Sequence, residues 1–349
     1  MSSRTPTDEA EARPGLQVDG LRLYARADLG RALVALATSV VPVLGLWVLM
    51  YLALGVSYVL VLVLAVPTAG FMVRTYILFH DCAHGSLLRG RRANARLGAV
   101  LAVMVFTPFA RWRHDHAVHH ATAGDLDRRG TGDIGTLTVN EYCARPMRSR
   151  LAYRLMRNPI VMFGLGPIHG MLLAPRWIGP SARRQIQRSV WGTNVALALV
   201  FGALWWLVGW RALVLVNAPL ILLAGGVGIW LFYVQHQFTH TYWERSPGWN
   251  NTDAALRGSS YLRLPKILQF FTGSIGLHHV HHLNTKIPSY NLQRAHDHVS
   301  IFRDVPAVSL WDGLRAVRLK LWDEDAARLV TWKERRRGAR VRSQRVTAR

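Results

Sequence analysis

Cysteine and acidic residues are both scarce in this chain. There are two cysteines among 349 residues, Cys82 and Cys143, which excludes a disulfide framework and a cysteine-based zinc site. There are 20 Asp and Glu against 43 Lys and Arg, so the formal net charge is +23. Such an excess predicts contact with nucleic acid, anionic lipid or an acidic partner, and the distribution of the charges has to decide among these.

The N-terminus lacks the short apolar core and the small-residue cleavage site of a signal peptide. The first apolar stretch is too long for a signal core and is followed by a second one. Residues 1–31 are therefore expected to form a polar segment on the cytoplasmic side.

Charge is nearly absent from four long apolar stretches, residues 32–54, 57–79, 190–210 and 212–234. At 1.5 Å per residue, the first would form a helix of about 35 Å, enough to cross a bilayer core of about 30 Å. The second is uncharged to about Met72, and its helix is expected to continue through Arg74 to His84. Four such lengths are too many for the buried helices of one soluble core. The prediction is an all-α polytopic membrane protein with four transmembrane helices in two hairpins.

The two hairpin turns contain a single arginine, Arg211. The other flanks of these stretches contain many more, at positions 22, 26, 31, 89, 91, 92, 96, 145, 148, 150, 154, 157, 183, 184 and 188. The positive-inside rule places these flanks and both termini in the cytoplasm of a bacterial inner membrane. Two shorter apolar stretches, residues 97–110 and 159–174, are predicted to be interfacial or re-entrant. Residues 32–300 are assigned to the membrane domain and 301–349 to a basic cytoplasmic tail. From Trp332 onward, that tail either lies on lipid headgroups or is simply solvated.

Histidine is the abundant residue that stands out, with 15 copies. Most fall into four clusters, at 80–84, 114–120, 236–240 and 278–282. On a helix, residues three and four apart share a face, whereas adjacent residues diverge by about 100°. Adjacent histidines can therefore serve two neighbouring metals. All four clusters fall on the predicted cytoplasmic side, which indicates one site in a cytoplasmic helical cap.

Nine histidines have the phase of metal ligands: His80, His84, His116, His119, His120, His236, His278, His281 and His282. They are too many for one tetrahedral zinc and suit two metals of higher coordination, with iron, copper and zinc all compatible. The other histidines are expected to be supporting or surface residues: His114, His169, His240, His279, His296 and His298. Three neighbours either orient ligand rings or are simply solvated, namely Asp81, Asp115 and Asn284.

These residues resemble the integral-membrane fatty acid desaturase superfamily, which is defined by three histidine boxes. The boxes here read H-x-x-x-H at 80–84, H-x-x-H-H at 116–120 and H-x-x-H-H at 278–282, within a resemblance that covers about residues 70–300. HDCAHGS, the GD after the second box, RNPIVMFGLGP, the QHQ around His236 and HHVHHLNTKIPSY are similar to the bacterial and plastid acyl-lipid branch, which includes Δ12 desaturases.

The resemblance implies a four-span fold whose cap holds two iron ions, where O₂ is used to desaturate a fatty acyl chain carried by lipid, coenzyme A or acyl carrier protein. The family's extra histidine corresponds to His236. In animal members an Asn four residues earlier joins the second metal through water, but this chain has Phe232 there, so that detail does not carry over. Acyl or hydrocarbon hydroxylases and carotenoid-modifying oxygenases of the same superfamily are the alternatives.

The heme-binding HPGG of a fused cytochrome b5 domain is missing. The resemblance therefore implies a separate electron donor, a ferredoxin or a cytochrome b5. Such carriers are typically acidic and would be attracted to a basic face, although the positive-inside rule explains the same charge without a partner.

Three other classes of protein are less compatible with the sequence. A transporter or metal-handling protein would carry polar residues within its spans, and only Asn194 and Asn217 come close. A membrane zinc hydrolase would need a motif such as H-E-x-x-H, which is absent. A nucleic-acid binder would concentrate its charge on a soluble patch rather than beside apolar spans.

Overall fold

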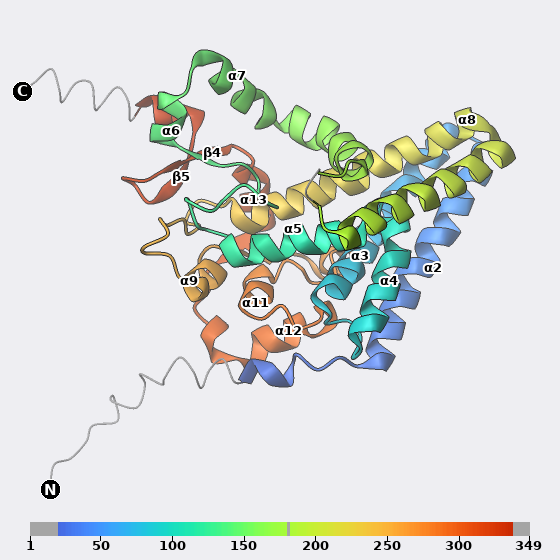
Figure 1. Ribbon diagram of the computed structural model, residues 1–349, viewed down its shortest axis with the longest axis horizontal. Coiled ribbons are helices and arrows are strands. Elements are labelled where there is room, and N and C mark those ends of the chain that lie inside the picture. The colour runs from blue at the N-terminus through green and yellow to red at the C-terminus, as the bar shows by residue number, and fades with distance from the viewer. Residues whose placement is uncertain (1–19, 180–181, 338–349) are drawn as a thin grey trace, which may run out of the picture.

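The computed structural model describes residues 20–179 and 182–337. Long helices gather at one side of the molecule, on the right of Figure 1, and short helices and strands form a cap on the left. The two parts meet where α3, α5 and α8 enter the cap, which is where the histidines lie.

The first two long helices form a hairpin, α2 (Leu29–Ala53) and α3 (Tyr58–His84). Asp28 and Ser57 cap their N-termini by accepting hydrogen bonds from backbone N–H groups. α3 ends at Gly85, whose φ of 67° is a left-handed conformation that glycine adopts without strain. The second predicted stretch thus continues as one helix to the first histidine pair.

The third long helix, α8 (Arg184–His236), has 53 residues, and at 1.5 Å each this is about 80 Å, far more than one bilayer crossing needs. It is interrupted at Gly209, where φ is 79° and ψ is 158°. Figure 1 accordingly shows α8 as two runs that meet at the far right. These runs correspond to the predicted stretches 190–210 and 212–234.

The outer faces of the long helices expose large apolar side chains, among them Val41, Val48, Leu52, Val63, Val66, Leu199, Trp206 and Leu207. An apolar surface of this extent is typical of contact with lipid. Within the described residues, three helices are long and apolar enough to cross a membrane, or four if the bent pair α4–α5 counts as one span. The structure therefore supports membrane association, and four spans in two hairpins stay a prediction.

Asn217, one of the two polar residues noted within the apolar stretches, has a structural use. Its side chain accepts a hydrogen bond from Trp47 Nε1 at 3.1 Å and donates one to the hydroxyl of Tyr51 at 2.8 Å. Both partners lie on α2, so the amide joins α8 to the first hairpin. This gives the residue a packing role rather than a place on a transport path.

The predicted re-entrant stretch 97–110 lies across a sharp bend between α4 (Arg91–Met104) and α5 (Phe109–Thr122). The two helices differ in direction by 104°. Gly98 permits the bend to close, because a methyl group at that position would lie 2.1 Å from a ring carbon of Phe109. The stretch 159–174 forms two π-helical turns and a 3₁₀ turn, η2 (Val161–Leu165), η3 (Ile168–Leu173) and η4 (Ala174–Arg176).

The cap contains strands as well as helices, which corrects the expectation of an all-helical cap. Its strands are β1 (Leu137–Thr138), β2 (Tyr261–Arg263), β3 (Ala307–Ser309), β4 (Leu319–Asp323) and β5 (Arg328–Thr331). They form a three-stranded sheet in the order β1-β4-β5 and a parallel pair β2-β3. Its short helices are η1 (Gly20–Leu23), α6 (Val139–Ala144), α7 (Met147–Met156), α9 (Asn251–Leu256), α10 (Lys266–Phe271), α11 (His278–Leu283), α12 (Ser289–His298), η5 (Ser300–Phe302) and α13 (Leu310–Ala316).

The C-terminal part of the chain also differs from the expected basic tail. Residues 301–337 are folded, because β4 pairs with β1 from far earlier in the chain and β5 completes that sheet. Trp332, the residue from which the expected tail was to lie on lipid headgroups or be solvated, packs its ring 5.1 Å from that of Tyr142. The strongly basic end, residues 338–349, lies outside the described residues, as do residues 1–19 of the N-terminal segment.

A buried arginine joins this sheet to α8. Arg157 is 1% exposed, and its Nη2 donates to the hydroxyl of Tyr233 at 3.1 Å, to Gln237 Oε1 at 2.9 Å and to the carbonyl oxygen of Leu319 at 3.2 Å. Gln237 directly follows His236, so the position of that histidine depends on this contact.

Replacing Arg157 by alanine is expected to lower the free energy of unfolding by about 2 kcal/mol or more, because buried acceptors on α8 and β4 lose their donor. The measurement is the melting temperature of the detergent-solubilised protein. Arg148→Ala on α7 is the matched control, since that arginine is exposed and should leave the melting temperature unchanged. Equal melting temperatures for the two variants would contradict this role for Arg157.

Candidate metal centre

Four helices bring the histidines together at the junction of the long helices and the cap. α3 provides His80 and His84 in its last turn, and α8 provides its final residue, His236. α5 and α11 contribute three each, His116, His119 and His120 from α5, and His278, His281 and His282 from α11. Figure 1 shows these helices converging in the middle of the molecule.

The nine histidines singled out in the sequence form two groups, in each of which the candidate ligand atoms lie within 4.8 Å of one another. The first contains His80, His84, His116, His120 and His281, and the second contains His119, His236, His278 and His282. Adjacent histidines divide between the groups, since His119 and His120 belong to different ones, as do His281 and His282. This is the division that the helical angle between neighbouring residues predicts.

Distances between ring nitrogens have the values expected for ligands of one metal. Nε2 of His236 lies 3.1 Å from Nε2 of His278, and Nε2 of His120 lies 3.0 Å from those of His116 and His281. Two nitrogens that bind one ion at about 2.1 Å and at a right angle lie about 3.0 Å apart.

Hydrogen bonds on the outer side of two rings fix which nitrogen faces the group. His236 Nδ1 lies 3.0 Å from the carbonyl oxygen of Gly258, which can only accept, so Nδ1 carries the hydrogen. His119 Nδ1 lies 2.6 Å from Asp133 Oδ1 and carries its hydrogen for the same reason. With Nδ1 as the donor, each Nε2 has a lone pair available, and the two Nε2 atoms face each other at 3.1 Å. Two such lone pairs repel each other unless a cation binds both.

Buried ring nitrogens without a hydrogen-bond partner also indicate that the two groups bind metal. Both nitrogens of His80 and the Nε2 atoms of His84 and His282 are buried and make no hydrogen bond. Buried polar atoms are rarely left unpaired, so these positions are suited to coordination. On α11, burial first and the neighbouring histidines second lower the pKa values of His278, His281 and His282 well below the usual range. These rings are therefore neutral at pH 7, the form that binds metal.

Asp133 is a functional residue that the sequence reasoning missed. It lies 14 residues beyond His119, in a loop, and its own side chain is 7% exposed where it meets the fully buried imidazole. A carboxylate on the outer nitrogen fixes the ring orientation and makes the inner nitrogen more basic. The sequence offers little to single out Asp133, since it is one of several aspartates after the second histidine box and does not lie at a helical spacing from the ligands.

Three polar residues beside ligands, Asp81, Asp115 and Asn284, were expected either to orient a ring or to be solvated, and their surroundings differ. Asp81 is buried, with Oδ1 3.5 Å from His80 Nδ1, and its other oxygen accepts from the backbone N–H of Ser289 at 2.7 Å. Asp115 instead contacts the exposed His114, at 3.2 Å, and Asn284 accepts from the backbone N–H of Lys286 at 3.0 Å. For Asp115 and Asn284 the contacts favour the second alternative, a solvated polar side chain, because these side chains bond away from the nine histidines.

The remaining histidines lie outside both groups. His279 is fully buried and pairs with His296, with Nε2 3.1 Å from Nδ1 of its partner. The others, His114, His169, His240 and His298, are exposed. His114 lies on α5 out of phase with its ligands, His240 lies beyond the end of α8, and His169 and His298 belong to elements that provide no ligand.

Replacing Asp133 by asparagine is expected to weaken metal binding at the second group by about 10- to 100-fold, because the amide holds the hydrogen on His119 Nδ1 less firmly. Metal retained after dialysis against graded chelator would measure this. Asp127→Asn is the control, since Asp127 pairs with Arg245 on the surface. Retention equal to wild type in D133N would show that Asp133 has no such role.

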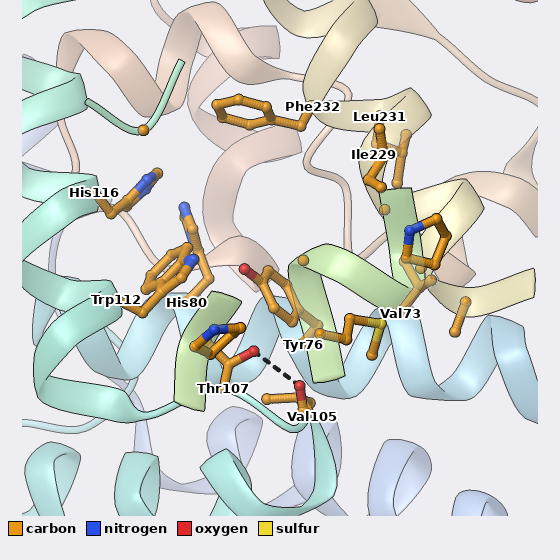
Figure 2. Close-up of a pocket in the computed structure, with 18 of the residues that line it drawn as sticks. Val73, Tyr76, His80, Val105, Thr107, Trp112, His116, Ile229, Leu231 and Phe232 are labelled. Carbon is orange, nitrogen blue, oxygen red and sulfur yellow. Dashed lines mark hydrogen bonds between the residues drawn. The ribbon is translucent and has the colours of Figure 1, made fainter. Parts of the chain in front are cut away.

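An apolar cavity of about 440 Å³ lies against both groups. It is lined by His80 and His116 of the first group and by His278 of the second, and its walls come from α3, the α4–α5 turn, the π-helical segment and the second run of α8. Figure 2 shows His80, His116 and Trp112 along one side of it, with Tyr76 and Phe232 nearby. The ring of Phe232 lies 5.2 Å from that of His119, so an apolar ring packs against a histidine of the second group.

Two glycines on α8 have different surroundings. A methyl group at Gly225 would lie 2.6 Å from Pro167 Cβ and 2.8 Å from Met171 Sδ, so Gly225 permits the π-helical segment to pack on α8. Gly228 has open space in front of it and lines the cavity.

Known proteins with similar sequences are described as fatty acid desaturases. The sequence profile of the family "Fatty acid desaturase" matches residues 56–305. A "Fatty acid desaturase" of Bacillus subtilis is 44% identical over 310 residues, which cover 89% of this chain and 88% of that protein. An "sn-1 oleoyl-lipid 12-desaturase" of Picosynechococcus is 26% identical, covering 74% of this chain and 73% of that protein. An "Omega-6 fatty acid desaturase, chloroplastic" of Arabidopsis thaliana is 27% identical, covering 64% and 50%.

The matched segment contains all three histidine boxes and His236, and these residues are the ones that the fold assembles into two groups able to hold metal ions. The resemblance to bacterial and plastid desaturases is thereby confirmed, and it implies an oxidoreductase that acts on fatty acyl chains. This chain belongs to the fatty acid desaturase family.

Proposed function

We propose that this protein is a membrane fatty acyl desaturase that introduces a double bond into an acyl chain, using O₂, two electrons and two iron ions. The observation that carries the proposal is the apolar cavity that touches histidines of both groups. An alkyl chain has no polar handle at its middle, so only an apolar channel beside the metals can hold one C–C bond in place.

The nine histidines would hold the two irons, five at the first group and four at the second. When bound, the irons supply the chemistry that activates O₂. The overall change balances as one O₂, two electrons, two protons and two chain hydrogens giving two waters and one C=C bond. The all-nitrogen ligand set is compatible with iron and does not by itself distinguish it from copper or zinc.

The chain's own residues position the reactants. Gly258 and Asp133 keep Nε2 of His236 and His119 free to coordinate. Trp112 stacks on His116, with centroids 4.3 Å apart, and forms part of the cavity wall. Val73, Ile229 and Leu231 line the same cavity and would exclude water from the reacting carbons.

Several finer features belong to the same proposal. The substrate is proposed to be a lipid-linked acyl chain, because the similar cyanobacterial protein is described as an oleoyl-lipid 12-desaturase. The site and both termini are proposed to face the cytoplasm of a bacterial inner membrane, on the charge asymmetry of the flanks. Electrons are proposed to come from a separate ferredoxin or cytochrome b5.

The test is to express the protein in a host rich in saturated and monounsaturated chains and to determine its fatty acids by mass spectrometry. A double bond absent from the empty-vector strain would establish the reaction and its position. A hydroxy acid instead would identify a hydroxylase, which shares the first hydrogen removal. If iron-loaded protein with a competent donor changes no acyl chain, the proposal fails for common fatty acids, and other hydrocarbons such as carotenoids become the substrates to test.

A further inference from the structure

Three helices that provide metal-binding histidines each carry an aromatic residue four positions before the first of those histidines. The pairs are Tyr76 and His80 on α3, Trp112 and His116 on α5, and Phe232 and His236 on α8. Residues four apart lie on one face of a helix, so each aromatic ring is on the same face as its histidine. All three aromatic residues line the apolar cavity, and Figure 2 shows them around one space.

The rings lie on the long-helix side of the histidines, because all three helices run toward the cap. α3 and α8 both end in a histidine where they reach the cap. Just before α5, Phe106 packs its ring 5.5 Å from that of Phe201 on the first run of α8. Beyond the end of α5, Asp125 pairs with Glu244 in the cap. One helical turn is about 5.4 Å, so the three rings form a layer at about that distance from the histidines.

The three rings form two walls of this layer. Tyr76 and Trp112 meet edge to face, with centroids 5.7 Å apart, and Trp112 stacks on His116 at 4.3 Å. Phe232 instead packs on the second group, with its ring 5.2 Å from that of His119. One wall therefore stands against the first metal group and the other against the second, with the cavity between them.

The layer beyond the rings is of a different kind. One further turn from the histidines, the cavity is lined by Met72, Pro108 and Gly228. Methionine is flexible, and Gly228 has open space in front of it. Aromatic side chains are larger and more rigid, since only two side-chain torsions can change. The rings are therefore the part of the channel that yields least to the shape of a chain.

The channel is also narrow. Met72 and His80 both line it and are eight residues apart on α3, about 12 Å along the helix. A volume of about 440 Å³ over that depth gives a mean cross-section below about 40 Å². A straight methylene chain fits such a channel, whereas a side branch at the level of the rings has to displace one of them.

We propose that Tyr76, Trp112 and Phe232 form an aromatic collar that selects acyl chains by their cross-section. A chain that is unbranched at the level of the collar passes beside the metals, and a chain with a methyl branch there is excluded. The collar also holds the chain laterally, so that the reacting carbons stay beside both histidine groups. This inference rests on the proposed desaturase function and adds to it the residues that determine which chains are accepted.

The test supplies an expressing host with stearic acid and, in the same culture, with one of a series of stearic acids that carry a single methyl branch at different carbons. Mass spectrometry gives the desaturated fraction of each chain, and the ratio of the two fractions is independent of expression level and electron supply. Phe232→Ala and Tyr76→Ala each remove a ring, whereas Tyr76→Phe keeps it. Phe71→Ala is the matched control on α3, since Phe71 is half-buried against Phe271 and does not line the cavity.

Wild type should desaturate chains branched within one narrow range of positions at least about tenfold less than stearic acid, because one extra methyl group in an apolar site changes selectivity by about 10- to 200-fold. F232A and Y76A should raise that ratio on the order of tenfold, and Y76F and F71A should match wild type. Equal ratios in all five proteins would overturn the proposal. Loss of iron from F232A and Y76A with the ratio unchanged would also overturn it, since the rings would then only support the ligands.

Binding is measured separately, without turnover, in nanodiscs. A stearoyl phospholipid that carries a diazirine labels the cavity on illumination, and the branched-chain phospholipids are included as competitors. They should compete with the label in F232A and fail to compete in wild type, and equal competition in both proteins would refute the collar. If wild type makes no double bond in any chain while this difference in competition is present, the desaturase function is refuted and the collar stands.

Discussion

Replacing His281 by alanine is expected to abolish desaturation and to remove metal from the protein. His281 Nε2 lies 3.0 Å from that of His120, and its ring centroid lies 4.4 Å from that of His80 and 4.7 Å from that of His84. The residue therefore joins ligands from α3 and α5, and its loss leaves the first group without its contribution from α11. Since the proposed reaction needs both metals, product formation should fall by about 1,000-fold or more.

The decisive measurements are iron per protein and acyl-chain product, made on the same preparation. Iron should fall from about two ions per chain toward one, because the second group keeps all four of its histidines. His114→Ala is the matched control, since His114 also lies beside a histidine box but is exposed and bonds to Asp115. Full iron content and wild-type product in H281A would show that the first group is not the metal site.

Filling the cavity at Gly228 is the second change with a large expected effect. A phenylalanine there would extend its ring into the cavity, because nothing lies within 4 Å of the position that a side chain would take. Desaturation of long acyl chains should fall on the order of 100-fold, because the chain is displaced from the metals while the metals stay bound. This combination of lost activity and full iron content distinguishes the cavity from the ligand set.

Gly192→Phe is the control on the same helix. Gly192 also has open space in front of it, but it is exposed on the first run of α8 and does not line the cavity. Product formation in G192F should equal that of wild type. If G228F desaturated long chains at the wild-type rate, the acyl chain would have to bind somewhere other than this cavity.

The pattern of histidines predicted most of the site because its information is local. His80 and His84, or His116 and His120, are one helical turn apart, so the helix alone places each pair on one face. The structure adds which pairs meet: His120 joins the group of His80, whereas His119 joins that of His236. Local reasoning left the roles of Asp81, Asp115 and Asn284 open, because proximity in sequence to a ligand does not decide which way a side chain turns.

Long-range contacts account for the features that the sequence did not reveal. Asp133 approaches His119 from a loop without regular spacing, and Lys286 reaches the backbone of His84 across the cap. The strands β1 and β4 are only two and five residues long, and their paired residues, such as Leu137 and Leu321, lie 184 positions apart in the chain, so neither carries a recognisable alternating pattern by itself. This is why residues 301–337 were expected to be a tail although they complete a sheet.

The apolar helices, the nine histidines and the family could all be read from the sequence, because uncharged length, helical phase and motif spacing are properties of neighbouring residues. The cytoplasmic side of the arginine flanks stays a prediction. Only the tertiary structure shows the division of the histidines into two groups and the cavity that reaches both. These depend on how α3, α5, α8 and α11 pack against one another, and packing between distant segments is fixed by burial and side-chain shape rather than by any local pattern.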